Sequence, residues 1–471
     1  MNKNMNLAIS IVLVVMLVFS LTPAATTFGQ STSQFETVVD PKLTETLAQT
    51  EEAVQVIVTF WGDEGVTEGQ LNVLEDVNIT TGFTFESLPI AGVLATKEQI
   101  EALATASEVR SLYLNSELEY FNEDSTDLTG VDKLREDPNY RFDGLPISGD
   151  GVTVLVNDSG VDGTHKDHEF GRKLVQNVMG TTNLNAYDRE LLPVTYLEDQ
   201  PNTDTNSGHG THVAGTVAGT GAMSSGKYEG VAPGADLVGY GSGAVLFILD
   251  ALGGFDYALT HQHEYDIRVV TNSWGSSGDF DPHNPINVAT KLCYDRNMII
   301  TFAAGNSGPS ADTHNPYAKA PWVISVAAGT KDGDLADFSS RGTEGHEESF
   351  ELDGQTWTWQ DRPTVTAPGV DVISTIPPSP LMPLGVSSEI DPAHQPYYAM
   401  MSGTSMATPH VAGIVALMLQ ANPSLTPDEV KDILQDTATD MPDYDAWEVG
   451  AGYVNAYDAV EKAYGMVTKE K

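Results

Sequence analysis

Three side chains that lie far apart in the sequence have the types needed to turn a serine into a nucleophile. They are Asp158, His209 and Ser405, and each lies within two residues of a glycine. A histidine can take the proton of a serine hydroxyl, and a carboxylate can hold that histidine in the required tautomer and stabilise its protonated form. These residue types therefore favour nucleophilic catalysis, provided that the fold brings them together.

Ser405 is followed by small and apolar residues that predict a helix over about 404–418. A serine at a helix start faces backbone N–H groups and the positive end of the helix dipole, which would stabilise a developing oxyanion. Pro409 would lie in about the first turn, where a missing N–H costs least. Taken alone, Ser405 could equally be an ordinary N-cap residue.

His209 and Asp158 also occur where elements are expected to begin or end. His209 follows a Gly-rich turn and would lie at the exposed start of a helix, and Asp158 follows a β-rich run at 152–156. The carboxyl end of a parallel strand is where α/β enzymes place reactive groups. The alternative for Asp158 is an ordinary turn residue. His212, one turn after His209, is expected to be a packed structural residue, because the zinc-protease pattern His-Glu-x-x-His does not occur.

Asn306 follows the apolar run 298–302 within a Gly-rich segment. Its amide could be a second oxyanion donor beside the N–H of Ser405, and such a donor typically contributes about a hundred- to a thousandfold in turnover. The alternative is an asparagine that adopts a turn conformation between glycines.

The elements that must position these side chains are predicted by apolar runs that alternate with helical stretches. Runs at 152–156, 267–271, 298–302 and 323–327 are apolar almost throughout, as in strands buried on both faces. We expect residues 122–471 to form one α/β domain with a doubly wound, mostly parallel sheet. Two stretches, 345–362 and 377–395, interrupt the pattern. The second could be a lid or an inert surface loop.

Residues 35–121 predict a separate, small α+β unit. Strands are expected at 54–60, 90–96 and 109–114, and helices at 68–77 and 96–105. Thr96 and Gln99 have the spacing of a capping box at the start of the second helix.

The segments around Asp158, His209, Asn306 and Ser405 resemble the four signature segments of the subtilases, in the chain order of that family. Further segments resemble the family at 230–235, 272–275, 367–369 and 450–455. The resemblance implies a subtilisin-like fold and a serine endopeptidase that acts through an Asp-His-Ser triad and an acyl-enzyme, with Asn306 and the Ser405 N–H as the oxyanion hole.

The resemblance also implies how polypeptide substrates bind. Ser273, Trp274 and Gly275 would line the pocket for the residue before the cut, and Gly241 and Gly243 would belong to the edge to which the substrate adds as a β-strand. Backbone pairing of this kind favours broad specificity. Ser307 carries no charge, so we expect a large apolar residue before the cut.

By the same resemblance, residues 35–121 are expected to be a ferredoxin-like prodomain that inhibits its own enzyme until it is cut off near Phe121. Leu118 would then fill the fourth pocket and Phe121 the first. Catalysis is expected to need no cofactor. A structural calcium ion fits the family, and Asp167 matches one position of a common family site, but the partner loop 219–229 differs.

Composition and the N-terminal residues limit the partners and the location that we expect for the protein. The formal net charge of −43 disfavours nucleic acid and anionic membrane surfaces as partners. Residues 1–25 have the basic start, apolar run and small exit residues of a secretory signal, with an uncleaved anchor as the alternative. The mature protein is expected to be secreted, soluble and monomeric. Cys293, the one cysteine, is expected to be buried and inert.

Two other functions remain open at this point. An esterase or lipase could use the same three residues, although their order and the sequence around Ser405 differ from the usual pattern of that fold. A secreted binding protein without activity is the other, although all four chemical residues are present.

Overall fold

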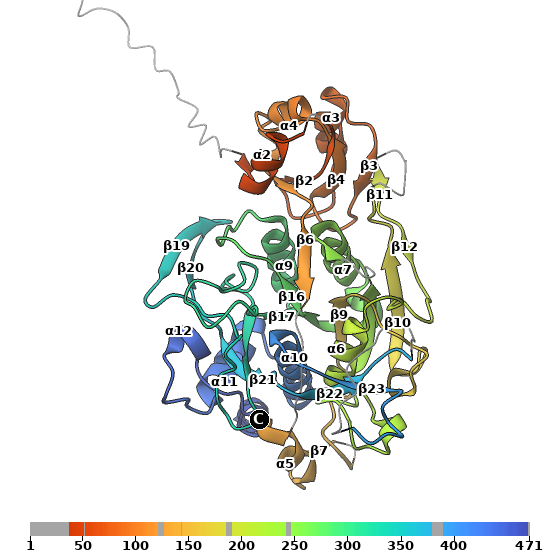
Figure 1. Cartoon of the computed structure of the whole chain (residues 1–471), viewed down its shortest axis with the longest axis vertical. Coiled ribbons are helices and arrows are strands. Elements are labelled where there is room, and N and C mark those ends of the chain that lie inside the picture. Colours follow the sequence, from red (N-terminus) through yellow and green to blue (C-terminus); the bar gives the residue numbers. More distant parts are fainter. Residues whose placement is uncertain are drawn as a thin grey trace, which may run out of the picture. The chain divides into compact units, whose positions relative to one another are not determined.

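The computed structural model describes residues 37–50, 52–120, 127–142, 144–184, 191–241, 246–378 and 390–469 (Figure 1). The predicted signal at 1–25, Phe121, Gly243 and much of the second interruption lie outside these residues. Within the described part, no helix is long and apolar enough to cross a membrane.

A central sheet of eight strands carries the larger part of the chain. Its order is β12-β10-β13-β9-β15-β17-β18-β21. Every neighbouring pair is parallel except β10 with β12. The strands span Thr153–Asp158 (β9), Leu174–Gly180 (β10), Tyr196–Leu197 (β12), Asp236–Gly241 (β13), Ile267–Asn272 (β15), Ile299–Ala303 (β17), Ile324–Gly329 (β18) and Val365–Pro368 (β21). The prediction of a mostly parallel α/β sheet is therefore confirmed.

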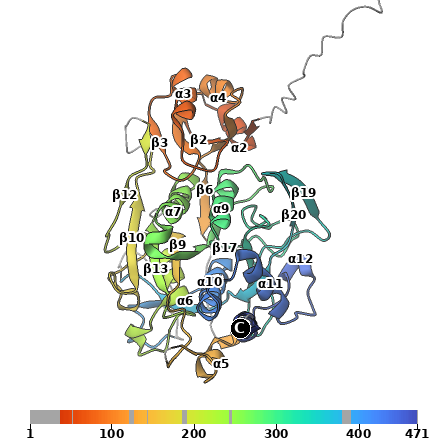
Figure 2. The same ribbon diagram turned by 180° about the vertical axis from the view of Figure 1, so that it is seen from behind.

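Two hydrophobic cores cover the two faces of this sheet. Val154 and Val156 of β9 pack in one core, and Leu155 between them packs in the other. The first core contains α6 (His209–Ala218), α10 (Thr404–Ala421), α11 (Pro427–Thr437) and α13 (Ala456–Lys469), and the second contains α7 (Ile248–Thr260) and α9 (Pro285–Asp295). Figure 2 shows the helices from the opposite side. Burial on both faces explains why the strands are apolar throughout.

The N-terminal residues form a second sheet with its own core. Its order is β1-β5-β2-β4-β3-β11, with α3 and α4 in the connections. The elements are β1 (Val38–Val39), α2 (Pro41–Leu47), β2 (Val54–Phe60), α3 (Glu68–Asp76), β3 (Gly82–Thr84), β4 (Ile90–Ala95), α4 (Lys97–Leu103) and β5 (Val109–Leu114). The predicted strands and helices are confirmed, whereas β1, α2 and β3 were missed. At α4, Thr96 N donates to Gln99 Oε1 at 2.9 Å, as the capping-box spacing predicts.

Short elements link the two parts. β11 (Leu192–Pro193) pairs with β3, and β6 (Glu117–Tyr120) pairs with β14 (Leu246–Phe247) and β16 (Trp274–Gly275). The first interruption, 345–362, contains an antiparallel hairpin of β19 (Glu347–Leu352) and β20 (Gln355–Gln360). The second interruption lies between the paired strands β22 (Val372–Thr375) and β23 (Tyr398–Met401), which lead into α10.

Candidate active site

Ser405 is the second residue of α10, whose N-cap residue is Gly403. Gly403 has a φ of 155°, a conformation that glycine adopts far more readily than other residues. The Ser405 side chain is buried, and its hydroxyl donates to the carbonyl oxygen of Ser273 at 2.6 Å. A helix leaves the N–H groups of its first turn without acceptors inside the helix, so this turn is suited to receive a negative charge.

Pro409 explains a second bond between Ser273 and Ser405. A helical residue donates its N–H to the carbonyl four residues earlier, but proline has no N–H. The carbonyl oxygen of Ser405 therefore receives no bond from position 409, and the Ser273 hydroxyl donates to it at 2.7 Å. The sequence placed Pro409 in about the first turn, whereas it is the sixth residue of α10 and so lies in the second.

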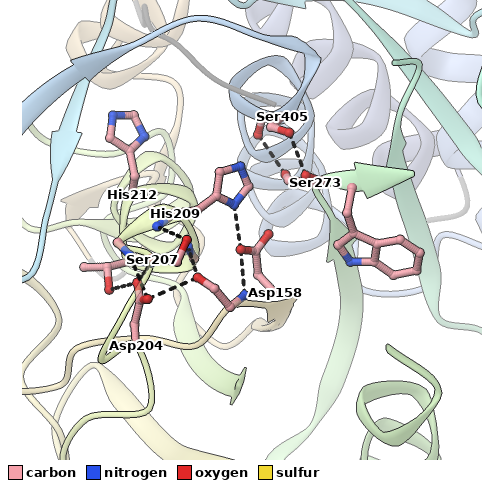
Figure 3. A network of polar contacts seen from close by, with 12 residues as sticks. Asp158, Asp204, Ser207, His209, His212, Ser273 and Ser405 are labelled. Atoms are coloured by element: carbon pink, nitrogen blue, oxygen red, sulfur yellow. Dashed lines mark hydrogen bonds and ion pairs between the residues drawn. The ribbon is translucent and has the colours of Figure 1, made fainter. Parts of the chain in front are cut away.

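Asp158 and His209 contact each other where β9 ends and α6 begins. The Nδ1 atom of His209 lies 2.6 Å from Oδ1 of Asp158, and both side chains are buried. A carboxylate only accepts hydrogen bonds, so Nδ1 carries the proton and Nε2 is the acceptor nitrogen of the neutral ring. Figure 3 shows the imidazole between Asp158 and the start of the helix that carries Ser405.

His209 is not at an exposed helix end, which corrects the sequence-based expectation. Its side chain is only 3% exposed, and all ten residues of α6 are buried. The reason is that α6 packs against α10, β9, β13 and β22 at once. A base shielded in this way interacts more strongly with Asp158 than it would in water.

Asn306 is held by the residue that precedes Ser405. Its Oδ1 atom accepts from the N–H of Thr404 at 3.0 Å and from the Thr404 hydroxyl at 2.9 Å. The Oγ1 atom of Thr404 in turn accepts from the N–H of Gly305 at 3.1 Å. Both bonds use the amide oxygen, so the amide nitrogen of Asn306 is the part that can donate to a bound ligand. This role of Thr404 was not predicted from the sequence.

Ser273, Trp274 and Gly275 contribute through different atoms. Trp274 and Gly275 pair antiparallel with Tyr120 and Glu119 of β6 through the backbone. The indole of Trp274 points into the core instead, where it is fully buried and its Nε1 donates to the carbonyl of Asn157 at 2.7 Å. The Trp274 side chain is therefore a core residue, and the backbone of residues 274 and 275 makes the contact with β6.

Gly241 does not lie on the edge strand for which it was predicted. It ends β13 inside the central sheet, opposite Asp158 of β9 and Met179 of β10. The strand that pairs with β6 on that side is β14, at Leu246 and Phe247. The reason is that β13 runs up to Gly241 itself, so the edge begins several residues later. Gly243 falls outside the described residues.

Asp204 organises the loops around Asp158 and His209, a role that was not predicted from the sequence. Its Oδ1 accepts from the Ser159 hydroxyl at 3.1 Å and the N–H of Gly208 at 2.8 Å, and its Oδ2 accepts from the N–H and hydroxyl of Thr211 at 3.0 and 2.6 Å. Ser159 also donates its N–H to Asp158 at 2.7 Å. Burial raises the pKa of Asp204, while these bonds favour its charged form. One signal was available, because Asp204 stands five residues before His209.

His212 and Cys293 have the structural roles that were predicted for them. His212 is fully buried, and burial together with the nearby His209 lowers its pKa to about 3. Cys293 is buried in α9, and burial raises the pKa of its thiol. Neither side chain is suited to nucleophilic or metal chemistry.

Both carboxylate oxygens of Asp167 accept hydrogen bonds from the protein. Oδ1 accepts from the N–H of Met223 at 3.0 Å, and Oδ2 accepts from the hydroxyl of Tyr398 at 2.8 Å. Each oxygen therefore already has one protein donor. Among the described residues, no group of three or more His, Cys, Asp or Glu side chains could hold a metal ion.

Comparisons with known proteins agree with this geometry. Residues 149–466 match the model of the subtilase family. Serine protease AprX of Bacillus subtilis (strain 168) is 31% identical over 445 residues, which cover 89% of this chain and 90% of that protein. M-protease of Shouchella clausii (strain KSM-K16) is 30% identical over 396 residues, covering 81% of this chain and 82% of that protein.

Solved structures show the same fold. The crystal structure of fervidolysin from Fervidobacterium pennivorans superposes with a TM-score of 0.62 at 24% identity and covers 87% of this chain and 61% of that one. That structure is described as a keratinolytic enzyme related to subtilisin. The family model and the relatives together establish that this chain belongs to the subtilase family and is a subtilisin-like serine peptidase.

Proposed function

We propose that the chain is a secreted, monomeric endopeptidase that is made as a self-processing precursor. The observation that carries this proposal is the position of β6, which pairs with β14 on one side and β16 on the other. Both pairings are antiparallel, and β16 directly follows Ser273, which is bonded to Ser405. Subtilisin-like enzymes bind extended peptides by strand addition, so β6 occupies the place of a substrate strand (orange in Figure 1).

In the proposed mechanism, Ser405 attacks the carbonyl carbon of the scissile peptide bond. The Ser405 hydroxyl turns from Ser273 and gives its proton to Nε2 of His209, and Asp158 stabilises the resulting imidazolium. The amide nitrogen of Asn306 and the N–H of Ser405 donate to the oxyanion. His209 then protonates the leaving amine. A water molecule gives a proton to His209 and attacks the acyl carbon, and His209 returns that proton to the Ser405 oxygen as the acyl–oxygen bond breaks.

The register of β6 supports cleavage after Phe121. Glu119 pairs with Gly275 and Tyr120 pairs with Trp274, so the last described residues of β6 run toward Ser273. Ser273 is the residue bonded to Ser405, which is why we expect the chain to be cut shortly after Tyr120, at the bond after Phe121. An apolar Phe121 agrees with the expected preference before the cut, where Ser307 supplies no charge.

Residues 35–121 would then be a prodomain that blocks the enzyme until it leaves. The order β5-β2-β4-β3, with α3 and α4 in the connections, supports a ferredoxin-like fold for this unit. A folding aid of this kind suits a large parallel sheet, because non-local strand pairing folds slowly.

Labelling with a fluorophosphonate probe, followed by a casein digest, tests the function. The secreted wild-type protein should take up the probe and digest casein, and Ser405→Ala should do neither. Labelling without digestion would point to an esterase, and no labelling would point to a silent protein. Mass spectrometry of the active protein should find a new terminus at residue 122, and active enzyme with an intact terminus near residue 26 would contradict self-processing.

A further inference from the structure

A cavity of about 220 Å³ is lined by the end of the β19–β20 hairpin, the segment before β18 and α11. Three cationic side chains line it, those of Lys319, Arg362 and Lys431, and the lining residues within the described part of the chain include no Asp or Glu. The whole chain has 66 acidic and only 23 basic residues. A cavity walled by cations in so acidic a protein favours an anionic ligand.

The main chain holds Lys431 of α11 at this cavity. Its Nζ donates to the carbonyl of Pro321 at 2.8 Å and to the carbonyl of Val323 at 2.9 Å. An ammonium group has three donors, so one remains for a further acceptor. Both partners are neutral carbonyl groups, so these bonds leave the positive charge of Lys431 uncompensated.

Arg362, at the end of the first interruption, brings a second cation to the cavity. Among the described residues, neither Arg362 nor Lys431 forms an ion pair with a carboxylate. Burial lowers the pKa of Lys431 to about 8, the charge of Arg362 contributes to this, and the charges of Asp428 and Asp432 oppose it. The two cations therefore lie close enough to repel each other, and an anion bound between them would reduce this repulsion.

Lys319 differs from the other two cations. It is only 5% exposed, and its Nζ lies 3.1 Å from Oδ1 of Asp361, which compensates its charge. The same ammonium lies 5.7 Å from the centre of the ring of Trp359, which also lines the cavity. Arg362 and Lys431 are therefore the residues with charge to offer a ligand.

We propose that this cavity is a binding site for a small oxyanion, held by the guanidinium of Arg362 and the ammonium of Lys431. A guanidinium binds two oxygen atoms of one carboxylate or phosphate group side by side, and a lysine adds a point charge. Both a free inorganic oxyanion and the carboxylate end of a short peptide have this chemistry. The volume of about 220 Å³ fits such a group and excludes a folded partner.

The bound anion would connect the first interruption with the C-terminal part of the chain. Residues 358–360 and Arg362 form one side of the cavity, and Lys431 and Gln435 of α11 belong to another. None of the lining residues belongs to the triad or pairs with β6. The site is therefore separate from the active site, and it gives the 345–362 interruption a task that the sequence could not assign.

Isothermal titration calorimetry of the full chain carrying Ser405→Ala tests the site. The titrants are sodium phosphate, sodium N-acetylglycinate and the uncharged N-acetylglycinamide, with sodium chloride holding the ionic strength constant. At least one of the two oxyanions should bind, and the amide should not. Phosphate binding alone would assign the site to a free inorganic ion, and N-acetylglycinate binding would assign it to a peptide carboxylate. No binding of either oxyanion would overturn the proposal.

Variants with one charge removed decide whether the anion binds in this cavity. Arg362→Met and Lys431→Met should each weaken binding by about tenfold or more, since a charge-assisted bond is lost. Lys462→Met is the matched control, because Lys462 pairs with Asp436 and does not line the cavity. Equal affinities in Arg362→Met and Lys462→Met would overturn the site. Arg362→Met alone decides this if Lys431→Met does not fold.

Hydrogen–deuterium exchange of the same Ser405→Ala chain then locates the bound anion. Saturating oxyanion should slow exchange of the β20 and α11 amides, and Arg362→Met should abolish this slowing. Slowing confined to other elements would place the anion elsewhere and contradict the proposal.

Discussion

The nucleophile is fixed by a compensation between three residues. Pro409 removes one helical hydrogen bond from the carbonyl of Ser405, and the Ser273 hydroxyl supplies a replacement at 2.7 Å. Because Ser273 also accepts from the Ser405 hydroxyl, the proline indirectly determines where the strand at 273–275 meets the nucleophile. Pro409, which removes a hydrogen bond from α10, thereby helps to align Ser405 with the strand at 273–275.

A double-mutant cycle tests this compensation. Ser273→Ala should cost about 1–3 kcal/mol of unfolding free energy, because a buried carbonyl loses its donor. In a Pro409→Ala background the helix can supply the missing N–H, so the cost of Ser273→Ala should fall by about 1 kcal/mol. Urea unfolding in the inactive Ser405→Ala chain measures all four variants, and strictly additive effects would contradict the coupling.

Asp204 is a positioning residue whose negative charge should also favour protonation of His209. Asp204→Asn keeps the size of the side chain but removes a buried negative charge two hydrogen bonds from Asp158. We expect kcat to fall by about tenfold with little change in KM, since the groove is untouched.

The pH profile separates this role from simple loss of packing. Less negative charge makes protonation of the base harder, so the acid limb of kcat/KM should move to lower pH in Asp204→Asn. Ser159→Ala removes one of the bonds to Asp204 without removing charge, and its acid limb should stay in place. An unshifted limb in Asp204→Asn would leave only a structural role.

At the scale of single residues, the sequence predicted most of the active-site residues but not the residues that hold them in place. Asp158, His209, Asn306 and Ser405 were found because each stands in a short local pattern. Asp204 and Thr404 were missed because their partners, Ser159 and Asn306, lie 45 and 98 residues away. Gly241 was misplaced because a Gly-Ser-Gly run does not show where β13 ends.

At the scale of elements, burial decided what could be predicted. Strands buried on both faces gave long apolar runs, whereas β3 has only three residues and β1 and β11 only two. The hairpin at 347–360 was read as an interruption because one side of it is exposed and charged. Its turn carried a signal that was overlooked, since Asp353 and Gly354 have φ values of 53° and 74° and Asp-Gly favours a two-residue hairpin turn.

The turn around Asp167 predicts an effect of chelation. Because Tyr398 and Met223 already donate to the Asp167 carboxylate, we expect no calcium ion at this turn. EDTA should therefore not lower the melting temperature by removing an ion from Asp167. Tyr398→Phe should instead lower the unfolding free energy by about 1–2 kcal/mol. Differential scanning calorimetry of the Ser405→Ala chain measures both. A drop with EDTA that disappears in Asp167→Asn would show that the carboxylate binds calcium after all.

At the scale of the whole molecule, docking of the N-terminal unit should depend on pH through Asp256 of α7. Its carboxylate accepts from Ser87 N of the N-terminal unit at 2.7 Å and from the hydroxyl of Tyr196 at 2.6 Å. Burial, with a smaller contribution from the charge of Glu86, raises its pKa from 3.8 to about 6. A group whose pKa is raised by docking takes up a proton, so its contribution is present below the free pKa and is lost as pH rises through about 6.

His283 acts in the opposite direction. Burial and Arg110 lower its pKa, while Asp281 and Asp353 oppose this, and its Nδ1 can accept from Arg110 only in the neutral form. Its contribution to docking is therefore lost as pH falls through that lowered pKa. Because docking takes up a proton at Asp256 and releases one at His283, the two contributions to the pH dependence oppose each other.

Exchange of the β5 amides in the Ser405→Ala chain, measured from pH 4 to 8 and corrected for the intrinsic rate, reads out this dependence. Asp256→Asn keeps an acceptor for Ser87 but cannot ionise, so its exchange should no longer speed up as pH rises through 6. His283→Gln should remove the acidic limb and leave the other in place. The two limbs belong to different contacts of one docked unit, so a variant that abolished both together would contradict the assignment.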